Sequence, residues 1–181
     1  IDAPKAASIL RNRKGVGGAE LGLANEMAIN QFIAHHSVIF QPEKKLMWVS
    51  TSPWQCGKYV AYDLNRIFSD SIDFNHEIYT ENLTVPADSF LQQQEYQQLM
   101  TYKRLAPVLR KQIKKKERLD EQTLHAFQHA NPHFFYVYEL LGDYYHATGQ
   151  QDKALRNWKK ALLLPIPKRS ESERIEHKIN N

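Results

Sequence analysis

The spacing of hydrophobic residues divides the chain into a first part with strand-like alternation and a second part with helical spacing. Residues 32–40 are rich in β-branched and aromatic types, and 46–51 repeat this pattern after turn-forming residues at 41–45. We therefore predict a β-hairpin over 32–51. Both sets of alternate positions in its first strand are largely apolar, so we expect other parts of the protein to cover both faces.

Shorter elements flank this hairpin. Asp2 is placed to cap a helix with Pro4 in its first turn, and a glycine cluster ends that helix. The cluster lacks the spacing of a phosphate-binding loop, and we interpret it as a tight connection. A further strand is expected at 58–62 and a helical turn at 64–68, and residues 85–87 mark a candidate domain boundary.

From residue 88 on, apolar residues three and four positions apart predict helices. Asp88 or Ser89 begins the first of them, and Pro107 kinks or divides it. The further helices are expected at 121–130, 133–148 and 151–164, with a last, strongly charged helix after a capping box at 170–173.

The helical pair at 133–164 carries the most specific local motif. An aromatic residue is followed by Leu-Gly, a tyrosine, the turn glycine Gly149, and an Ala-x-x-x-aromatic step, which resembles the tetratricopeptide repeat. The residues expected to pack the pair are Tyr138, Leu141, Gly142, Tyr145, Ala154, Trp158 and Ala161. One repeat cannot form a groove alone, so a pair packed on the preceding helices is favoured over a peptide-binding groove.

Composition and charge narrow the picture further. The chain has 181 residues, of which 42% are hydrophobic and 24% charged, which is typical of one or two globular domains. Its net charge is +4, but segment 103–118 alone carries +7, so the remainder is acidic. A solvated helix face fits this pattern better than a nucleic-acid site, and we expect no nucleic-acid partner. No apolar run approaches the roughly 18 residues of a membrane-spanning helix, so no membrane span is expected.

Candidate chemistry is sparse. Cys56 is the single cysteine, has no base beside it in the sequence, and is interpreted as a structural thiol. His35 and His36 would point to opposite faces of the predicted strand and could not bind one metal ion together. Together with Ser37 and Trp54, the histidines are candidates for a pocket wall. We assign no catalytic residue, cofactor or metal site.

The order of segments resembles the carboxy-terminal part of isopenicillin-N acyltransferase-like proteins of Bacteroides-like bacteria, which are related to choloylglycine hydrolases. The segments that carry the resemblance are LRNR at 10–13, NEMAINQ at 25–31, IAHHSVIF at 33–40, LMWVSTSPWQ at 46–55 and GKYVAYDL at 57–64. Members of this type also have a helical tail with a tetratricopeptide-like pair.

The resemblance implies an α+β chain. Residues 1–87 would be the carboxy-terminal part of an N-terminal-nucleophile αββα sandwich (helix plus β-hairpin), followed by an all-α region at 88–181. Family members cleave themselves to expose an N-terminal cysteine, and they hydrolyse or transfer acyl groups at linear amides. The chain begins with Ile1, which is not a nucleophile, and Cys56 lies where relatives need no cysteine. We therefore expect the carboxy-terminal portion of a linear amide hydrolase or acyltransferase, without its catalytic cysteine and inactive alone.

The expected partners follow from this hypothesis. They are an upstream catalytic domain of the same protein and an amide or acyl small molecule as the substrate of the whole enzyme. Exposed sheet edges and apolar faces of the hairpin favour self-association. The resemblance also implies export to the periplasm or cell envelope. The alternative hypothesis is a noncatalytic tetratricopeptide-like module that binds another protein through the helical half.

Overall fold

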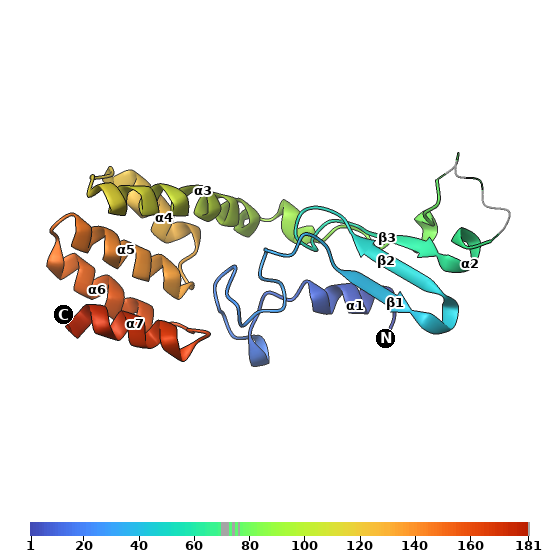
Figure 1. Ribbon diagram of the computed structural model, residues 1–181, viewed down its shortest axis with the longest axis horizontal. Helices are drawn as coiled ribbons and strands as arrows, with labels where there is room; N and C mark the ends of the chain where they lie inside the picture. The colour runs from blue at the N-terminus through green and yellow to red at the C-terminus, as the bar shows by residue number, and fades with distance from the viewer. Residues whose placement is uncertain (70–72, 74, 76, 181) are drawn as a thin grey trace. The chain divides into compact units, whose positions relative to one another are not determined.

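The computed structural model describes residues 1–69, 73, 75 and 77–180, and the fold is α+β (Figure 1). In chain order, the elements are α1 (Ala3–Leu10), β1 (Val38–Gln41), β2 (Leu46–Ser50), β3 (Tyr59–Asp63), α2 (Leu64–Ile67), α3 (Gln94–Lys115), α4 (Glu121–Ala130), α5 (Phe135–Ala147), α6 (Gln151–Leu162) and α7 (Arg169–Asn180). The chain forms two compact units, one from residues 1–13 and 29–92 and one from 14–28 and the chain after residue 92.

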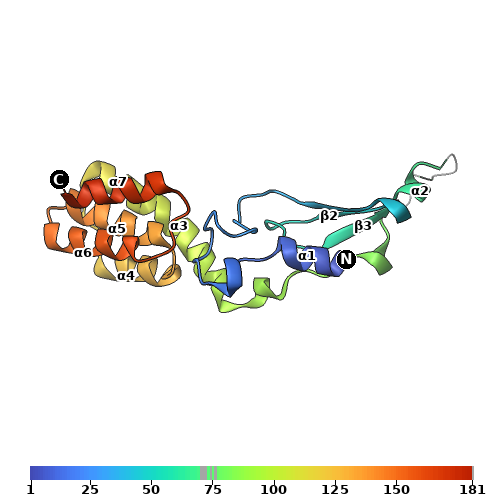
Figure 2. The ribbon, with the colours of Figure 1, turned by 90° about the horizontal axis from the view of Figure 1, so that it is seen from below.

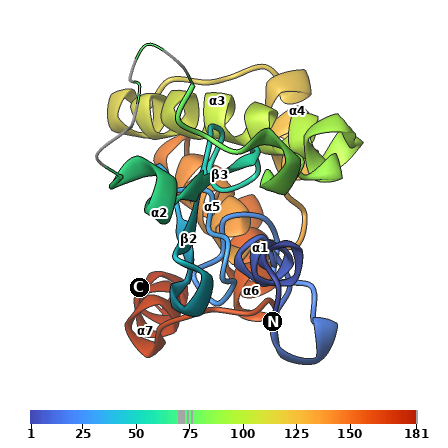
Figure 3. The same cartoon turned by 90° about the vertical axis from the view of Figure 1, so that its right-hand side faces the viewer.

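The first unit is built on an antiparallel sheet with the strand order β1-β2-β3. Trp48 pairs with Ile39 on one side and with Ala61 on the other, so these residues share one face. Helix α1 is capped by Asp2, whose carboxylate accepts a hydrogen bond from Lys5 N at 2.9 Å, and it packs on this face (Figures 2 and 3). The core between helix and sheet consists of Ala3, Ala7, Trp48, Tyr59, Ala61 and Val85.

The strands expected at 46–51 and 58–62 are confirmed as β2 and β3, but the expected start of the hairpin at residue 32 is wrong. β1 begins only at Val38. Phe32 has a left-handed φ of 54°, is fully buried, and packs on Phe90 with the ring centroids 5.3 Å apart. Its N–H donates to Asn30 Oδ1 at 3.0 Å, so this residue turns the chain instead of extending a strand. The connection between β1 and β2 has four residues, 42–45, rather than five.

Helices α3 to α7 belong to the second unit, and the expected helices at 121–130, 133–148 and 151–164 are confirmed as α4, α5 and α6. Helix α3 continues through Pro107, where the sequence predicted a kink or a division. The Tyr102 ring on α3 stacks on Phe127 of α4 at 5.7 Å and meets Phe134 edge-on at 5.8 Å. These aromatic contacts connect α3 with α4 and with the start of α5.

Segment 14–28 belongs to the second unit because long-range contacts hold it there. The buried Asn131 side chain forms two hydrogen bonds with the backbone of Leu23: Leu23 N donates to Oδ1 at 2.9 Å, and Nδ2 donates to Leu23 O at 2.7 Å. Gly22 has a φ of 75°, and a Cβ there would lie 2.6 Å from Phe134 Cα. Only glycine fits this close approach without strain. The boundary expected after residue 87 therefore differs from the observed division, in which segment 14–28 belongs with the helices.

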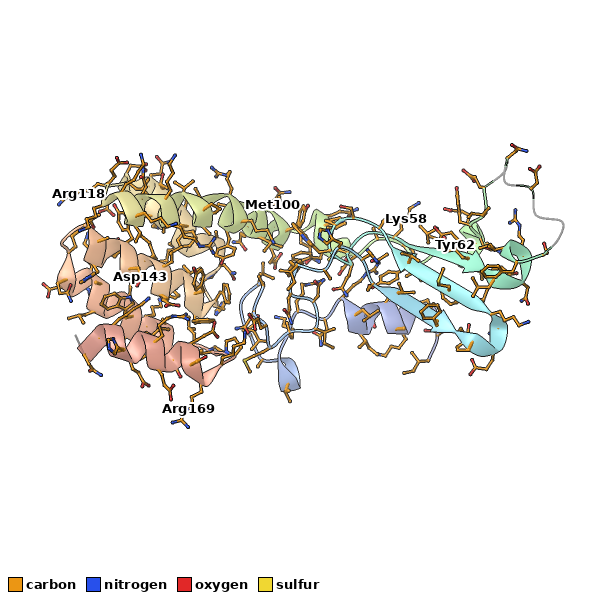
Figure 4. All side chains as sticks on the ribbon, in the orientation of Figure 1. Lys58, Tyr62, Met100, Arg118, Asp143 and Arg169 are labelled. Carbon is orange, nitrogen blue, oxygen red and sulfur yellow. The ribbon has the colours of Figure 1, made fainter. Side chains whose placement is uncertain are left out.

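A buried carboxylate joins α5 to α7. Glu139 accepts hydrogen bonds from Arg174 Nε and Nη2 and from Lys178 Nζ, each at 2.8 Å. Lys178 also donates to both carboxylate oxygens of Asp143 at 2.8 Å, and Figure 4 shows the place of Asp143 on α5. Burial alone would raise the pKa of Glu139, but the hydrogen bonds from Arg174 and Lys178 outweigh it and hold that pKa below its usual value.

Candidate functional site

The sheet has a second face, opposite the one on which α1 packs. Cross-strand pairing joins Phe40 to Met47 and Met47 to Tyr62 on this side. The residues of this open face are Val38, Phe40, Met47, Val49, Val60 and Tyr62. Phe40 is 63% exposed and Val38 is 38% exposed, and the others are half-buried. Within the described part of the chain, the expected cover is therefore present on one face of the hairpin, under α1, and the other apolar face meets solvent.

The loop between β2 and β3 has a strained backbone. Trp54 and Gln55 have φ values of 40° and 70°, in the left-handed region that non-glycine residues seldom adopt. Gln55, Cys56 and Gly57 are nevertheless buried, and a Cβ at Gly57 would overlap atoms of Thr51. Such strain persists only where surrounding contacts hold the chain in place, and it often occurs at functional sites.

Arg11, at the end of α1, makes many of these contacts. Its Nε donates to Gln55 O at 3.1 Å, and its Nη2 donates to the carbonyls of Gly57 and Pro86 at 2.8 Å each. The guanidinium also lies over the Tyr59 ring, 5.1 Å from its centroid. One side chain thus joins α1, the strained loop and the segment after β3. Lysine could not replace Arg11 here, because its single ammonium group lacks the fixed planar arrangement of several N–H donors.

A second arginine supports the same region. Arg13 forms an ion pair with Asp88 at 2.7 Å and lies over the Phe90 ring, 4.1 Å from its centroid. Asp88 N donates to Cys56 O at 2.8 Å, and an Asp88 carboxylate oxygen accepts from Phe90 N at 2.9 Å. Both members of the ion pair are largely shielded from solvent, so water and salt screen their attraction less than that of an exposed pair.

Cys56 lies at the centre of these contacts. Asn30 Nδ2 donates to its sulfur at 3.4 Å and to Trp54 O at 3.3 Å. Burial raises the pKa of the Cys56 thiol, and the Asn30 hydrogen bond opposes this only in part. A fully buried thiol with a raised pKa is a poor nucleophile, so its environment favours the structural interpretation.

The structure places the four candidate pocket residues in different surroundings. His35 and His36 are exposed and precede β1, so the strand alternation expected for them does not apply. Ser37 Oγ is hydrogen-bonded to the Tyr59 hydroxyl, and Ser37 N donates to Ser50 Oγ at 2.7 Å. Trp54 is half-buried and meets Phe32 edge-on at 6.0 Å. In the described part of the chain, no cluster of three or more His, Cys, Asp or Glu is suited to a metal ion.

The seven helical-pair residues lie on α5 and α6. Gly142 is buried against the Trp158 ring, and Trp158 Nε1 donates to Asp143 Oδ1 at 3.0 Å. Tyr145 is only half-buried, whereas its neighbour Tyr144 is buried and its hydroxyl accepts from Leu119 N at 2.8 Å. The residues with an exposed fraction of 3% or less are Tyr138, Leu141, Ala154, Trp158 and Ala161.

Sequence reasoning did not identify the polar residues that hold the strained loop. Arg11 lies 44 or more residues from the carbonyls that it binds, and Arg13 lies 75 residues from Asp88. Two local signals pointed to these residues: the LRNR segment at 10–13, which contains both arginines, and Asn30, which precedes an apolar run. Neither pattern is specific for such a role.

The comparisons with known proteins add no relative: no family model, curated protein or solved structure matches the chain. Among the described residues, no helix has the length and apolar character needed to cross a membrane.

Proposed function

We propose that this chain is the carboxy-terminal portion of a linear amide hydrolase or acyltransferase of the N-terminal-nucleophile type, and that its open face packs against a second sheet of the same protein. The observation that carries the proposal is a sheet with α1 on one face and an apolar, solvent-exposed opposite face. One half of an αββα sandwich has this arrangement, a helix layer outside and an apolar sheet face inside. The ordered segments between residues 10 and 64 support the same hypothesis.

The energy of burial favours a cover for this face. Phe40 and Met47 lie opposite each other on neighbouring strands, and each gains about 1.5–3 kcal/mol when it passes from water to an apolar environment. Because Met47 is already half-buried, covering the pair would contribute about 3 kcal/mol. The remaining apolar members of the open face add to this sum.

In the proposed enzyme, this chain would help to shape the substrate pocket, and it would not supply the nucleophile. Cys56 is internal and buried, and its pKa is raised, so it fits neither the position nor the reactivity of an N-terminal nucleophile. Arg11 and the strained loop 52–57 would form a rigid end of the sheet. The α5–α6 pair would serve as a tetratricopeptide-like packing unit, because its small and aromatic residues are buried against each other.

The gene upstream of the Ile1 codon provides the first test. We expect an in-frame segment with a cysteine that self-cleavage makes N-terminal. The whole protein should then release amines from N-acyl amides, and replacing that cysteine with alanine should abolish the release. Cys56→Ala is the matched control and should keep the activity. A gene without such a segment, or a folded Cys56→Ala protein without activity, would contradict the proposal.

A further inference from the structure

The second unit contains a pocket of about 360 Å³, near the lower end of the range for small-molecule sites. Its lining combines aromatic residues with the carboxylates Glu26 and Glu171 and the ring of Pro167. The aromatic residues are Tyr102, Phe134, Phe135 and Tyr136. The pocket therefore combines an apolar surface with groups of both charges, since Lys103 and Arg110 also line it.

The cations come from one stripe of α3. Lys103, Ala106, Pro107 and Arg110 follow the spacing that places residues on the same helix face, and all four line the pocket. Arg110 Nε donates to the Tyr136 hydroxyl at 3.2 Å, and its guanidinium lies over the Tyr136 ring, 5.4 Å from the centroid. Partial burial lowers the pKa of Lys103, so its ammonium has lost part of its hydration. An anionic ligand group beside Lys103 would favour its charged form.

One of the two carboxylates in the lining offers an acceptor. Oε2 of Glu171 is buried and has no hydrogen-bond partner among the described residues. A buried polar atom without a partner is costly, and a ligand N–H would remove this cost. Glu26, the other carboxylate, forms an ion pair with Lys168 at 2.5 Å. The acceptor best suited to a ligand cation is therefore Glu171.

The part of the lining that comes from Ala24 and Glu26 is held in a fixed conformation. Ala24 lines the pocket with a left-handed φ of 68°. The neighbouring Asn25 is fully buried, and its Nδ2 donates to Pro165 O and to Leu21 O at 3.0 Å each. With the Asn131 hydrogen bonds to Leu23, these contacts fix the segment that carries Ala24 and Glu26. This part of the lining is therefore ordered without a ligand.

We propose that this pocket binds a zwitterion with an apolar side chain, of the size of an amino acid or a dipeptide. The ligand ammonium would donate to Glu171 Oε2, and the ligand carboxylate would face Lys103 and Arg110. The apolar side chain would lie against the aromatic residues of the lining, such as Phe134. The pocket is lined by residues of the second unit only, so the inference does not rest on the proposed hydrolase or acyltransferase activity.

Calorimetric titration of the full chain tests the ligand class. The probes are L-phenylalanine and L-alanyl-L-phenylalanine, compared with phenethylamine and 3-phenylpropanoate, which carry one charge each. We expect at least one zwitterion to bind about tenfold more tightly than either singly charged probe. Equal binding of a singly charged probe, or no zwitterion binding up to about 10 mM, would overturn the proposal.

Variants test the site. Glu171→Gln and Lys103→Met should each weaken zwitterion binding about tenfold or more, because each removes one charge that the ligand contacts. Glu173→Gln is the matched control, since Glu173 lies on the same helix but pairs with Arg169 at the surface and should leave affinity unchanged. Thermal unfolding followed by circular dichroism checks each fold, and Glu171→Ala, which also removes the carboxylate, replaces any Glu171→Gln protein that unfolds. Unchanged affinity in the folded variants would place binding elsewhere and reject the assignment.

Discussion

Gly142 of α5 and Trp158 of α6 are packed so closely that any side chain at position 142 would overlap the indole ring. The ring cannot easily move away, because its Nε1 donates to Asp143 at 3.0 Å and its atoms are 97% shielded from solvent. This contact sets how closely the two helices approach each other.

Gly142→Ala should therefore destabilise the protein by about 2 kcal/mol, even though alanine favours a helix by about 1 kcal/mol relative to glycine. Urea unfolding followed by circular dichroism measures the change. Gly149→Asn is the control: Gly149 has a φ of 77° and open space around it, and asparagine tolerates that conformation, so we expect a much smaller effect. A stabilised Gly142→Ala protein would show that the two helices can move apart.

Glu139→Gln should lower stability by about 3 kcal/mol at neutral pH, because Arg174 and Lys178 lose their shared partner. The folded pKa of Glu139 is lowered, so its contribution is fully present above the usual value of 4.5 and is lost as pH falls through the folded pKa. The stability difference between wild type and variant should hence stay constant from neutral pH to about pH 5 and shrink in more acidic buffer. The measurement is the free energy of unfolding of both proteins across this pH range.

Glu173→Gln is the control, because Glu173 forms an exposed ion pair with Arg169. It should show little loss of stability and little dependence of that loss on pH. If the stability difference between wild type and Glu139→Gln persisted in acid, the loss of stability would come from packing and not from the charge of Glu139.

Phe40→Lys should reduce self-association of the chain by removing the most exposed residue of the open face. Sedimentation velocity over a range of concentrations should show association for wild type and a shift toward monomer for the variant. Phe68→Lys is the matched control, because Phe68 is 80% exposed but lies at the end of α2, outside the sheet. Equal shifts in the two variants would indicate general hydrophobic association rather than pairing through the open face.

Arg11→Gln should make the Cys56 thiol react about tenfold faster with a disulfide reagent, since the strained loop would open more often. The rate of thiol labelling under native conditions is the measurement. Arg66→Gln is the control, because Arg66 makes its hydrogen bond to Glu77 O at the surface. An unchanged labelling rate in Arg11→Gln would mean that other contacts are sufficient to hold the loop closed.

The sequence predicted the positions of strands and helices correctly where a short stretch of residues carries the pattern of the element. β2 and β3 are short apolar runs bounded by polar residues, and Gly149 ends α5 in the left-handed conformation that its position predicted. The α+β class follows from these patterns alone. Phe32 was misassigned because a buried aromatic residue in a turn has the same hydrophobic character as one in a strand.

The candidate sites depended on contacts that local patterns do not contain. Arg11 and Asp88 act through partners far along the chain, and their residue types are common at surfaces. The pocket shows the same limit. Lys103 and Arg110 stood out as part of a basic segment, but Glu171 comes from a helix some 60 residues later, and only the fold brings them together.

The two hydrogen bonds between Asn131 and Leu23 have a consequence for the dissection of this protein. Because segment 14–28 belongs to the second unit, the chain crosses between the units after residues 13, 28 and 92. A single cut after residue 92 should leave two fragments that stay associated, because segment 14–28 belongs to the second unit. A separate helical fragment would lack the Leu23 backbone that pairs with the Asn131 side chain. Each unit is thus built from two separate stretches of the chain. A single break in the gene would therefore separate neither unit intact from the other.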